Sequence, residues 1–230
     1  MEGRWSDSSD TYLNTLGYAR KLNDQWTFLG RSIVNVQLNN TAGGTDLFQG
    51  RLLTGLAWRQ TEEDVWNALF RYEYKYEDGS TTLGTTDMRR QVHTLATSVN
   101  YQPDRRWIVS GHYATKFVQE SYDVGPEGDY IGHLVAGRVL FEINPRWDVG
   151  LNLAANFNDS FNNRQYAIGP EIGRIFSKNV RIGLGYNITG FSDRDFDTSV
   201  TTKGLFLSLR IKFDENLLKW ARFDGKESRQ

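Results

Sequence analysis

The chain of 230 residues is 39% hydrophobic and 24% charged, has a formal net charge of -1, and contains no cysteine. The lack of cysteine excludes disulfide frameworks, thiolate metal sites and cysteine catalysis. An aromatic content of 13% argues against disorder, and the balanced charge argues against a dedicated nucleic-acid binder. No stretch approaches the about 18 to 20 apolar residues that a membrane-spanning helix needs, so the sequence disfavours a helical membrane protein.

The strongest signal is an alternation of period two, which is clearest in residues 65–77. The even positions are mostly aromatic: Trp66, Ala68, Phe70, Tyr72, Tyr74 and Tyr76. The odd positions are mostly charged: Asn67, Leu69, Arg71, Glu73, Lys75 and Glu77. Because successive side chains of a strand point to opposite faces, this pattern predicts a strand with one aromatic and one charged face.

The same alternation recurs along the chain and predicts about eleven full strands. They start near residues 12, 26, 48, 66, 91, 107, 133, 147, 166, 180 and 205, and the first of them has the weakest pattern. The runs are about 10 to 13 residues long, whereas strands of soluble proteins average about 5 to 6 and tilted transmembrane strands need about 9 to 11. Their length therefore favours a transmembrane sheet.

The connections between these runs alternate between short and long. Short turns are expected at residues 23–25, 61–64, 103–106, 144–146 and 177–179, where turn-forming or charged residues gather. Longer polar loops are expected near residues 39–46, 78–89, 120–131, 159–165 and 192–202. Short turns on one rim and long loops on the other are typical of an outer-membrane barrel.

A tryptophan repeat supports this layout. Trp26, Trp66, Trp107 and Trp147 are 40, 41 and 40 residues apart, and each stands near the end of a short turn. One hairpin per repeat places all four at one height, and tryptophan prefers the membrane interface because its ring is apolar and its N–H is polar. The four residues are therefore expected to form an interface girdle.

Two other all-β folds also produce alternation. A period near 40 with tryptophan fits a β-propeller, and Trp147-Asp148 matches its blade dipeptide, but a blade needs four short strands per repeat. A soluble β-sandwich would not make one face so aromatic over so many long strands. The prediction is an all-β, closed, antiparallel, up-and-down transmembrane barrel of about 12 strands (range 10–14) over residues 1–213, since only closure satisfies every backbone group in lipid.

The last strand carries the most specific motif. Residues 205–213 resemble the C-terminal signal of bacterial outer-membrane proteins, which places apolar residues at alternate positions and ends in an aromatic: Leu207, Leu209, Ile211 and Phe213. The resemblance implies insertion by the barrel assembly machinery into the bacterial outer membrane, with the lipid bilayer and lipopolysaccharide as partners. Residues 166–171, 183–191 and 203–215 also resemble the C-terminal barrel of large Gram-negative surface proteins, which implies an upstream domain.

The two ends of the chain raise further expectations. Seventeen residues follow Phe213, and this periplasmic tail, residues 214–230, is expected to be a short interfacial helix or a frayed end. Bacterial barrels usually have an even number of strands, so an eleven-strand count leaves one strand short. Residues 3–6 are expected to be its remaining end, in a chain that is the C-terminal part of a longer protein or a 12-stranded barrel with a clipped first strand.

Charged residues on the polar face are the candidate lumen lining. They are Arg31, Arg51, Arg59, Arg71, Glu73, Lys75, Glu77, Lys116, Arg138, Glu142, Glu171, Arg181, Arg210 and Lys212, and the basic ones outnumber the acidic ones. One interpretation is a pore that attracts anions. The other is a lumen filled by salt-bridged side chains, as in many narrow barrels.

Catalytic and metal sites find little support. The three histidines, His93, His112 and His133, form no recognisable catalytic pattern and are expected to be wall residues. Asp193, Asp195 and Asp197 echo the start of a calcium loop, but the sixth and twelfth positions do not fit, so a solvated acidic loop is expected. Acidic residues of another loop could bind divalent ions that bridge lipopolysaccharide: Glu120, Asp123, Glu127 and Asp129.

The sequence therefore predicts a membrane anchor or a passive, porin-like channel for small solutes, without catalysis, cofactor or metal. A translocator that displays a larger surface protein is the alternative, and an outer-membrane enzyme is the lesser one.

Overall fold

Twelve strands make up the regular structure of the described residues. The computed structural model describes residues 2–40, 46–63, 65–80, 87–104, 106–123, 127–158, 163–177, 180–196 and 201–211. The strands are β1 (Glu2–Trp5), β2 (Ser9–Lys21), β3 (Trp26–Asn39), β4 (Leu47–Arg59), β5 (Trp66–Ser80), β6 (Asp87–Tyr101), β7 (Trp107–Tyr122), β8 (Gly128–Asn144), β9 (Trp147–Asn158), β10 (Asn163–Ser177), β11 (Val180–Asn187) and β12 (Gly204–Ile211).

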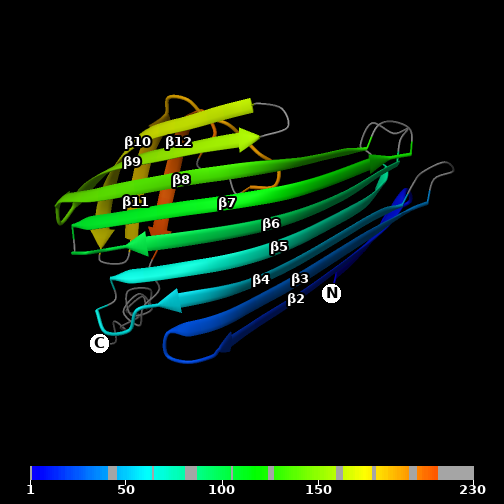
Figure 1. The fold of residues 1–230 in the computed structure, drawn as a ribbon, viewed down its shortest axis with the longest axis horizontal. Helices are drawn as coiled ribbons and strands as arrows, with labels where there is room; N and C mark the ends of the chain where they lie inside the picture. The colour runs from blue at the N-terminus through cyan, green and yellow to red at the C-terminus, as the bar shows by residue number, and fades with distance from the viewer. Residues whose placement is uncertain are drawn as a thin grey trace, which may run out of the picture.

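The strands form one sheet in which each pairs with its neighbours in sequence. The order runs from β1 to β12, and every pairing is antiparallel (Figure 1). The predicted all-β, up-and-down sheet is thus confirmed, while the propeller and the two-sheet sandwich are wrong. Among the described residues β1 and β12 do not pair, so closure into a barrel stays a prediction.

Strand length separates this sheet from an ordinary soluble one. Strands β2 to β10 have between 12 and 17 residues, and only β1, β11 and β12 are shorter. The short strand expected at residues 3–6 is present as β1, which pairs with β2 from Glu2–Leu13 to Trp5–Asp10. No helix among the described residues has the length and apolar character that a bilayer crossing requires.

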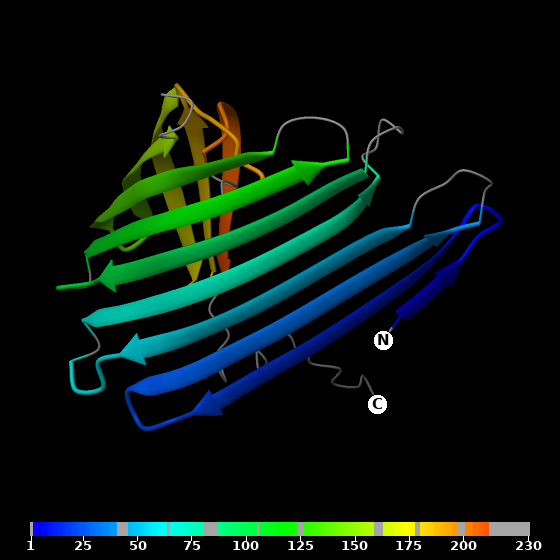
Figure 2. The ribbon, with the colours of Figure 1, turned by 45° about the vertical axis from the view of Figure 1, so that its right-hand side comes forward.

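The sheet curls, and its polar face is the concave one. Figure 2 shows β9 to β12 turned out of the plane of β2 to β5. The connection between β11 and β12, which we call the inserted segment (residues 188–203, described to 196 and from 201), contacts inward side chains of β5, β6 and β7. Only a curled sheet brings strands so far apart in the order to one connection, so the charged face lines a hollow and the aromatic face is convex.

The short turns share one capping arrangement. In three of them a side-chain oxygen accepts hydrogen bonds from the backbone N–H groups two and three residues further on: Asn23 (2.9 and 2.9 Å), Asp104 (2.7 and 3.1 Å) and Asn144 (2.9 and 3.1 Å). Asn and Asp form this turn because their side-chain oxygens imitate a backbone carbonyl. The third residue is each time a tryptophan that begins the next strand, which explains the fixed place of tryptophan in the repeat.

Candidate functional site

Strand register brings the predicted lumen residues to the concave face. The pairs Arg51–Lys75, Arg138–Asn152 and Arg181–Arg210 lie opposite each other on that face. Their shared side follows from the alternation, because residues paired across antiparallel strands point the same way. Lys212 lies outside the described residues, so thirteen of the fourteen predicted lumen residues have a described position: Arg31, Arg51, Arg59, Arg71, Glu73, Lys75, Glu77, Lys116, Arg138, Glu142, Glu171, Arg181 and Arg210.

The inserted segment leaves the sheet near a proline of β10. Pro170 has no N–H to give to a neighbouring strand, and the β10–β11 ladder stops one residue after it, at Glu171–Gly185. Gly169 leaves room for the turn, because a Cβ there would lie 1.9 Å from Oδ1 of Asn187. Gly190 plays the same part within the segment, since its Cβ would lie 2.3 Å from the Thr201 carbonyl oxygen. The chain therefore turns into the hollow at the end of β11.

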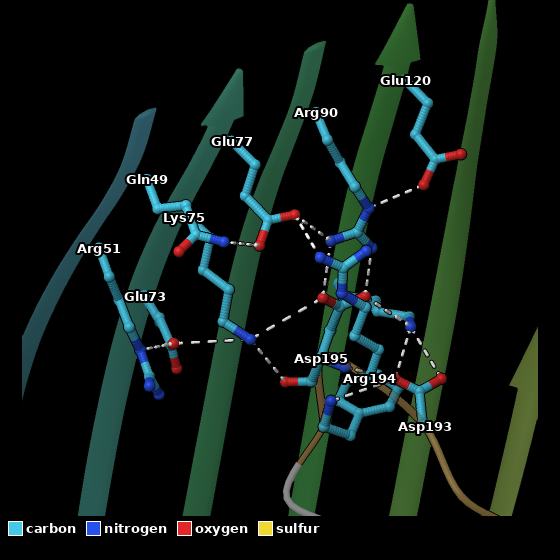
Figure 3. A network of polar contacts seen from close by, with 12 residues as sticks. Gln49, Arg51, Glu73, Lys75, Glu77, Arg90, Glu120, Asp193, Arg194 and Asp195 are labelled. Atoms are coloured by element: carbon cyan, nitrogen blue, oxygen red, sulfur yellow. Dashed lines mark hydrogen bonds and ion pairs between the residues drawn. The ribbon is translucent and has the colours of Figure 1, made fainter. Parts of the chain in front are cut away.

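Two aspartates fasten the segment to the wall (Figure 3). Asp195, whose side chain is only 1% exposed, accepts two hydrogen bonds from the guanidinium of Arg90, at 3.0 and 2.6 Å, and one from Lys116 at 3.1 Å. Asp193 accepts two more from the Lys116 ammonium, at 2.7 and 2.8 Å. Bidentate hydrogen bonds between oppositely charged side chains are among the strongest that side chains form. They tie β6 and β7 to the segment.

The same network continues across β5 and β7. Arg90 also donates to Glu120 at 2.7 Å, and Arg194 of the segment donates to Glu77 at 2.6 Å. On the other side Glu73, which is buried, pairs with Arg51 and lies 3.7 Å from the Lys75 ammonium. We call this set the loop-side network: Arg51, Glu73, Lys75, Glu77, Arg90, Lys116, Glu120, Asp193, Arg194 and Asp195 (Figure 3). Its five bases match its five acids, so its formal charge is zero.

The pKa of Asp195 reflects its contacts with Arg90 and Lys116. Burial by itself would raise the pKa of Asp195, but the hydrogen bonds and charges of Arg90 and Lys116 outweigh it and lower the pKa from 3.8 to about 2. A carboxyl whose pKa falls on folding stabilises the folded state in its charged form. Asp195 is therefore ionised wherever the segment is in place at neutral pH.

Apolar packing holds the segment as well. Phe191 and Phe196 are buried in one cluster with small or aliphatic residues of the concave wall: Ala96, Ala114, Leu134 and Ala167. The ammonium of Lys116 lies 4.9 Å from the ring centre of Phe196, within the range of a cation–π contact. The alanines leave the space that the two rings fill.

A second network lies nearer the short turns, and we call it the turn-side network: Arg138, Asp148, Asn152, Glu171, Arg181 and Ser208. Glu171, with no exposed side-chain area, accepts from Arg138 at 2.6 and 2.7 Å and from Arg181 at 2.6 Å. Arg181 also donates to Asp148 at 2.6 Å and to Ser208 at 3.1 Å. This network crosses β8 to β12.

Three arginines of the concave wall differ from these. Arg31, Arg71 and Arg210 form no ion pair within 4.0 Å to an acidic side chain in the described ranges. Arg31 and Arg71 belong to β3 and β5. The positive charges of Arg31 and Arg71 are therefore not compensated by direct contacts with acidic side chains in the described ranges.

Two expectations about acidic residues were wrong. Asp193 and Asp195 do not lie in a solvated loop, because both are paired with bases inside the hollow; Asp197 is outside the described residues. Glu120 does not lie in a loop, because it belongs to β7 and pairs with Arg90. In the described part of the chain no group of three or more His, Asp or Glu side chains could hold a metal ion.

Sequence reasoning missed several residues of the networks. Arg90 has the same phase as Val92 and Thr94 in β6, so the alternation could have placed it on the concave face. Asp148 likewise alternates with the outward Trp147 and Val149. Phe191 and Phe196 gave no such signal, because they lie in a connection with no period.

The remaining predicted positions fall on the convex face and its edges. Four strands begin with a tryptophan directly after a short turn: β3 with Trp26, β5 with Trp66, β7 with Trp107 and β9 with Trp147. Leu207 and Leu209 of the assembly signal point outward, 71% and 61% exposed. The side chain of Ile211, together with Phe213 and the tail 214–230, is outside the description. His93 and His133 bond to Tyr72 and Tyr113 outside, and only His112 faces inward, beside Ser98.

Comparison with known proteins gives two structural likenesses. A KdgM porin in complex with disordered oligogalacturonate matches at a TM-score of 0.41 and 10% identity, over 90% of this chain and 94% of its own. A NanC porin matches at a TM-score of 0.46 and 7% identity, over 90% of this chain and 95% of its own. No family model and no curated protein matches the sequence. At these values the likenesses do not tell what this chain carries or binds.

Proposed function

We propose that the chain forms a closed barrel in the bacterial outer membrane and acts as a passive channel for small solutes. The convex face supports a lipid environment, because large apolar side chains are exposed along all of it, from Leu16 on β2 to Leu205 on β12, 69% and 73% exposed. Soluble monomers rarely expose apolar patches beyond a few hundred Å². In lipid the free edges of β1 and β12 have no other hydrogen-bond partner, so their pairing would complete the barrel.

The main observation in favour of a channel is that the inserted segment leaves part of the concave wall uncovered. A cavity of about 280 Å³ lies between Arg194 and Asp195 of the inserted segment and inward residues of β3 to β5, among them Asn35, Gln49 and Lys75. Arg51, at its side, keeps 45% of its side chain exposed. A lumen filled by salt bridges alone would leave no such water-accessible lining beside the segment.

The charges on this lining support a preference for anions. Arg31 and Arg71 have no acidic partner within 4.0 Å in the described ranges, whereas the loop-side network is neutral. Rings or rows of basic side chains raise the local concentration of anions in a pore. The passage along β2 to β5 would therefore favour anionic over cationic solutes.

Single-channel recording in planar bilayers tests the proposal. The full chain, refolded into detergent and added to a bilayer, should give discrete current steps. In a KCl gradient the reversal potential should have the sign expected for a channel that is more permeable to Cl⁻ than to K⁺. The interior networks favour a second candidate, a filled barrel that only anchors. Absence of current at any voltage, from protein whose strand content and detergent-bound mass show correct insertion, would reject the channel in favour of the anchor.

Assembly remains part of the same proposal. The outward alternation of Leu205, Leu207 and Leu209 on β12 supports recognition by the barrel assembly machinery, with lipopolysaccharide as the outer-leaflet neighbour. Replacing Leu207 and Leu209 with Ser should reduce the amount of inserted barrel in cells while the level of the transcript stays constant. Unchanged insertion would reject this role for the two leucines.

A further inference from the structure

A second cavity lies between the inserted segment and the concave wall of β6 to β10. It has a volume of about 270 Å³, and its lining includes Asn187, where β11 ends, and Thr201 of the inserted segment. The surface that this cavity offers to a ligand is almost entirely carbon. An apolar cavity of about 150 Å³ stays free of water and binds a benzene molecule, so this cavity has the size for a somewhat larger apolar molecule.

Strand register explains the carbon surface. Ala136 of β8 lies directly opposite Ala154 of β9, and Ala154 lies opposite Ala167 of β10, so their methyl groups are neighbours on the concave face. Ala167 belongs to the apolar cluster of Phe191 and Phe196 that holds the inserted segment, and Ala154 packs against that cluster. The cavity therefore continues the apolar packing of the hollow.

The polar side chains that β6 and β7 contribute to the lining are bonded to one another. Ser98 bonds His112 at 2.8 Å, and Ser110 donates to Asn100 at 2.6 Å. In both pairs the two residues lie directly opposite each other across the two strands. These polar groups interact within the wall, and the carbon atoms of the same side chains face the cavity.

The other polar side chains of the lining are bonded as well. Arg138 donates to both carboxylate oxygens of Glu171, at 2.6 and 2.7 Å, and this contact also balances its charge. Asn152 donates to the same carboxylate at 3.2 Å, and Asn187 and Thr201 donate to backbone carbonyl groups at 2.8 and 2.9 Å. A charged ligand would find no uncompensated opposite charge among these residues, so its transfer from water would be costly.

Water is a poor occupant of a space with such walls. A buried water molecule makes about three hydrogen bonds to polar groups, and a carbon surface offers few of them. An empty cavity is unfavourable too, because the atoms of its wall lack contacts on one side. A molecule of carbon and hydrogen would supply those contacts without breaking any hydrogen bond of the wall.

We infer that this cavity is a binding site for a small, uncharged, apolar molecule of about six to ten carbon atoms. The inference goes beyond the proposed channel, because the site is distinct from the cavity beside Arg51 and Lys75 and its occupation does not require conduction. Binding is expected to be weak, with a Kd on the order of 1 mM, because so small a ligand makes few contacts. A charge on the ligand should weaken binding by about tenfold or more.

NMR of the alanine methyl groups tests the site on the full chain in detergent micelles, with toluene as the probe. Toluene should shift the methyl signals of Ala136, Ala154 and Ala167 until the site is saturated. Ala155 is the internal control, because it follows Ala154 and points to the convex face, where toluene dissolved in the micelle gives a shift that does not saturate. Benzoate and benzylammonium, which have the same ring but carry a charge, should require about tenfold higher concentrations.

A larger side chain in the cavity should abolish binding. In Ala136→Leu the added atoms occupy the space, so toluene should no longer shift the signals of Ala154 and Ala167. Ala57→Leu makes the same exchange on the concave face of β4, outside the lining of the cavity, and should leave the shifts unchanged.

The outcomes separate the site from the channel. Protein that conducts ions but shows no saturable shift, or binds benzoate as tightly as toluene, overturns the site alone. Unchanged shifts in Ala136→Leu, in a variant whose circular dichroism matches that of the wild type, overturn it as well. Saturable shifts in protein that never conducts support the site and reject the channel.

Discussion

The two sides of the concave wall are built differently. Along β3 to β5 the inward side chains include long charged ones that are only partly paired, with Arg31, Arg51 and Arg71 reaching into the hollow. Along β6 to β12 the inward side chains are often small, such as Ala96 and Ala114, and the space is taken by the inserted segment and the turn-side network. One alternating pattern of sequence therefore produces a lining on one side and a packed interior on the other.

This difference teaches that alternation decides which face a residue is on, but the size of the inward residue decides what the face can do. Small inward residues admit a second layer of chain, and aromatic rings of that layer then exclude water. Long charged residues without partners stay hydrated. If the comparison is correct, changes on the packed side should alter access to the lumen, and changes on the lining side should alter selectivity.

The largest effect is expected from breaking the fastening of the inserted segment. Arg90→Ala combined with Lys116→Ala removes the bases that hydrogen-bond the carboxylates of Asp193 and Asp195 and leaves Asp195 only Lys75, at 3.8 Å; removing one partner of a buried ion pair costs about 3 to 5 kcal/mol. The segment should leave the hollow, so single-channel conductance should rise severalfold. Arg194→Ala is the control, because the Arg194 side chain is 61% exposed and its pair with Glu77 should contribute little. Equal conductance in the double variant and the wild type would show that the segment does not limit the passage.

The next effect concerns the lining side. Arg31→Glu combined with Arg71→Glu reverses the charge of two inward arginines of β3 and β5, so the reversal potential in a KCl gradient should move toward that of a cation-selective channel. Conductance itself should change less, because neither residue holds the segment. Arg20→Glu makes the same charge change on the convex face, opposite Phe28, and should leave selectivity as it is. A shift as large in Arg20→Glu would mean that the lining is not where selectivity arises.

A smaller effect is expected from acid. The pKa of Asp195 is lowered from 3.8 to about 2 by Arg90 and Lys116, so its stabilisation is fully present above about pH 4 and is lost as the pH falls through about 2. The shift corresponds to roughly 2 kcal/mol. Urea unfolding in detergent at pH 5 and pH 2 should show this loss in the wild type beyond that in Asp195→Asn.

The acid experiment depends on the difference between the two proteins, since other carboxyls titrate in both. Asp193 and Glu120 face the same bases as Asp195, and Lys75 lies 3.8 Å from its Oδ1. Asp195→Asn should already be less stable at pH 5. Equal losses in wild type and variant would locate the acid-sensitive carboxyl elsewhere in the network.

Much of this architecture could be predicted from the sequence, because period two fixes the face of each strand residue. The inward position of Arg138 and the outward one of Leu207 follow from phase alone. The inserted segment could not be found in this way. The path of the segment depends on Pro170 and Gly169 of β10 and on the space beside the inward alanines of distant strands. None of these features can be recognised from the sequence of residues 188–203 itself. The polarity of Asp193 and Asp195 indicated solvent, whereas their partners lie on strands about 80 to 100 residues away.

The smallest effect tests whether the two sides differ only in their interiors. The turns at Asn23 and Asn144 have the same capping arrangement, although one joins β2 to β3 and the other joins β8 to β9. Asn23→Ala and Asn144→Ala should each lose two hydrogen bonds and destabilise the fold by about 1 kcal/mol. The urea midpoint in detergent measures this, and Asn→Asp at each position, which keeps the accepting oxygen, should cost less. A much larger loss at Asn144 alone would mean that packing in the hollow also depends on its turn, so that the two sides are not built on one common hairpin.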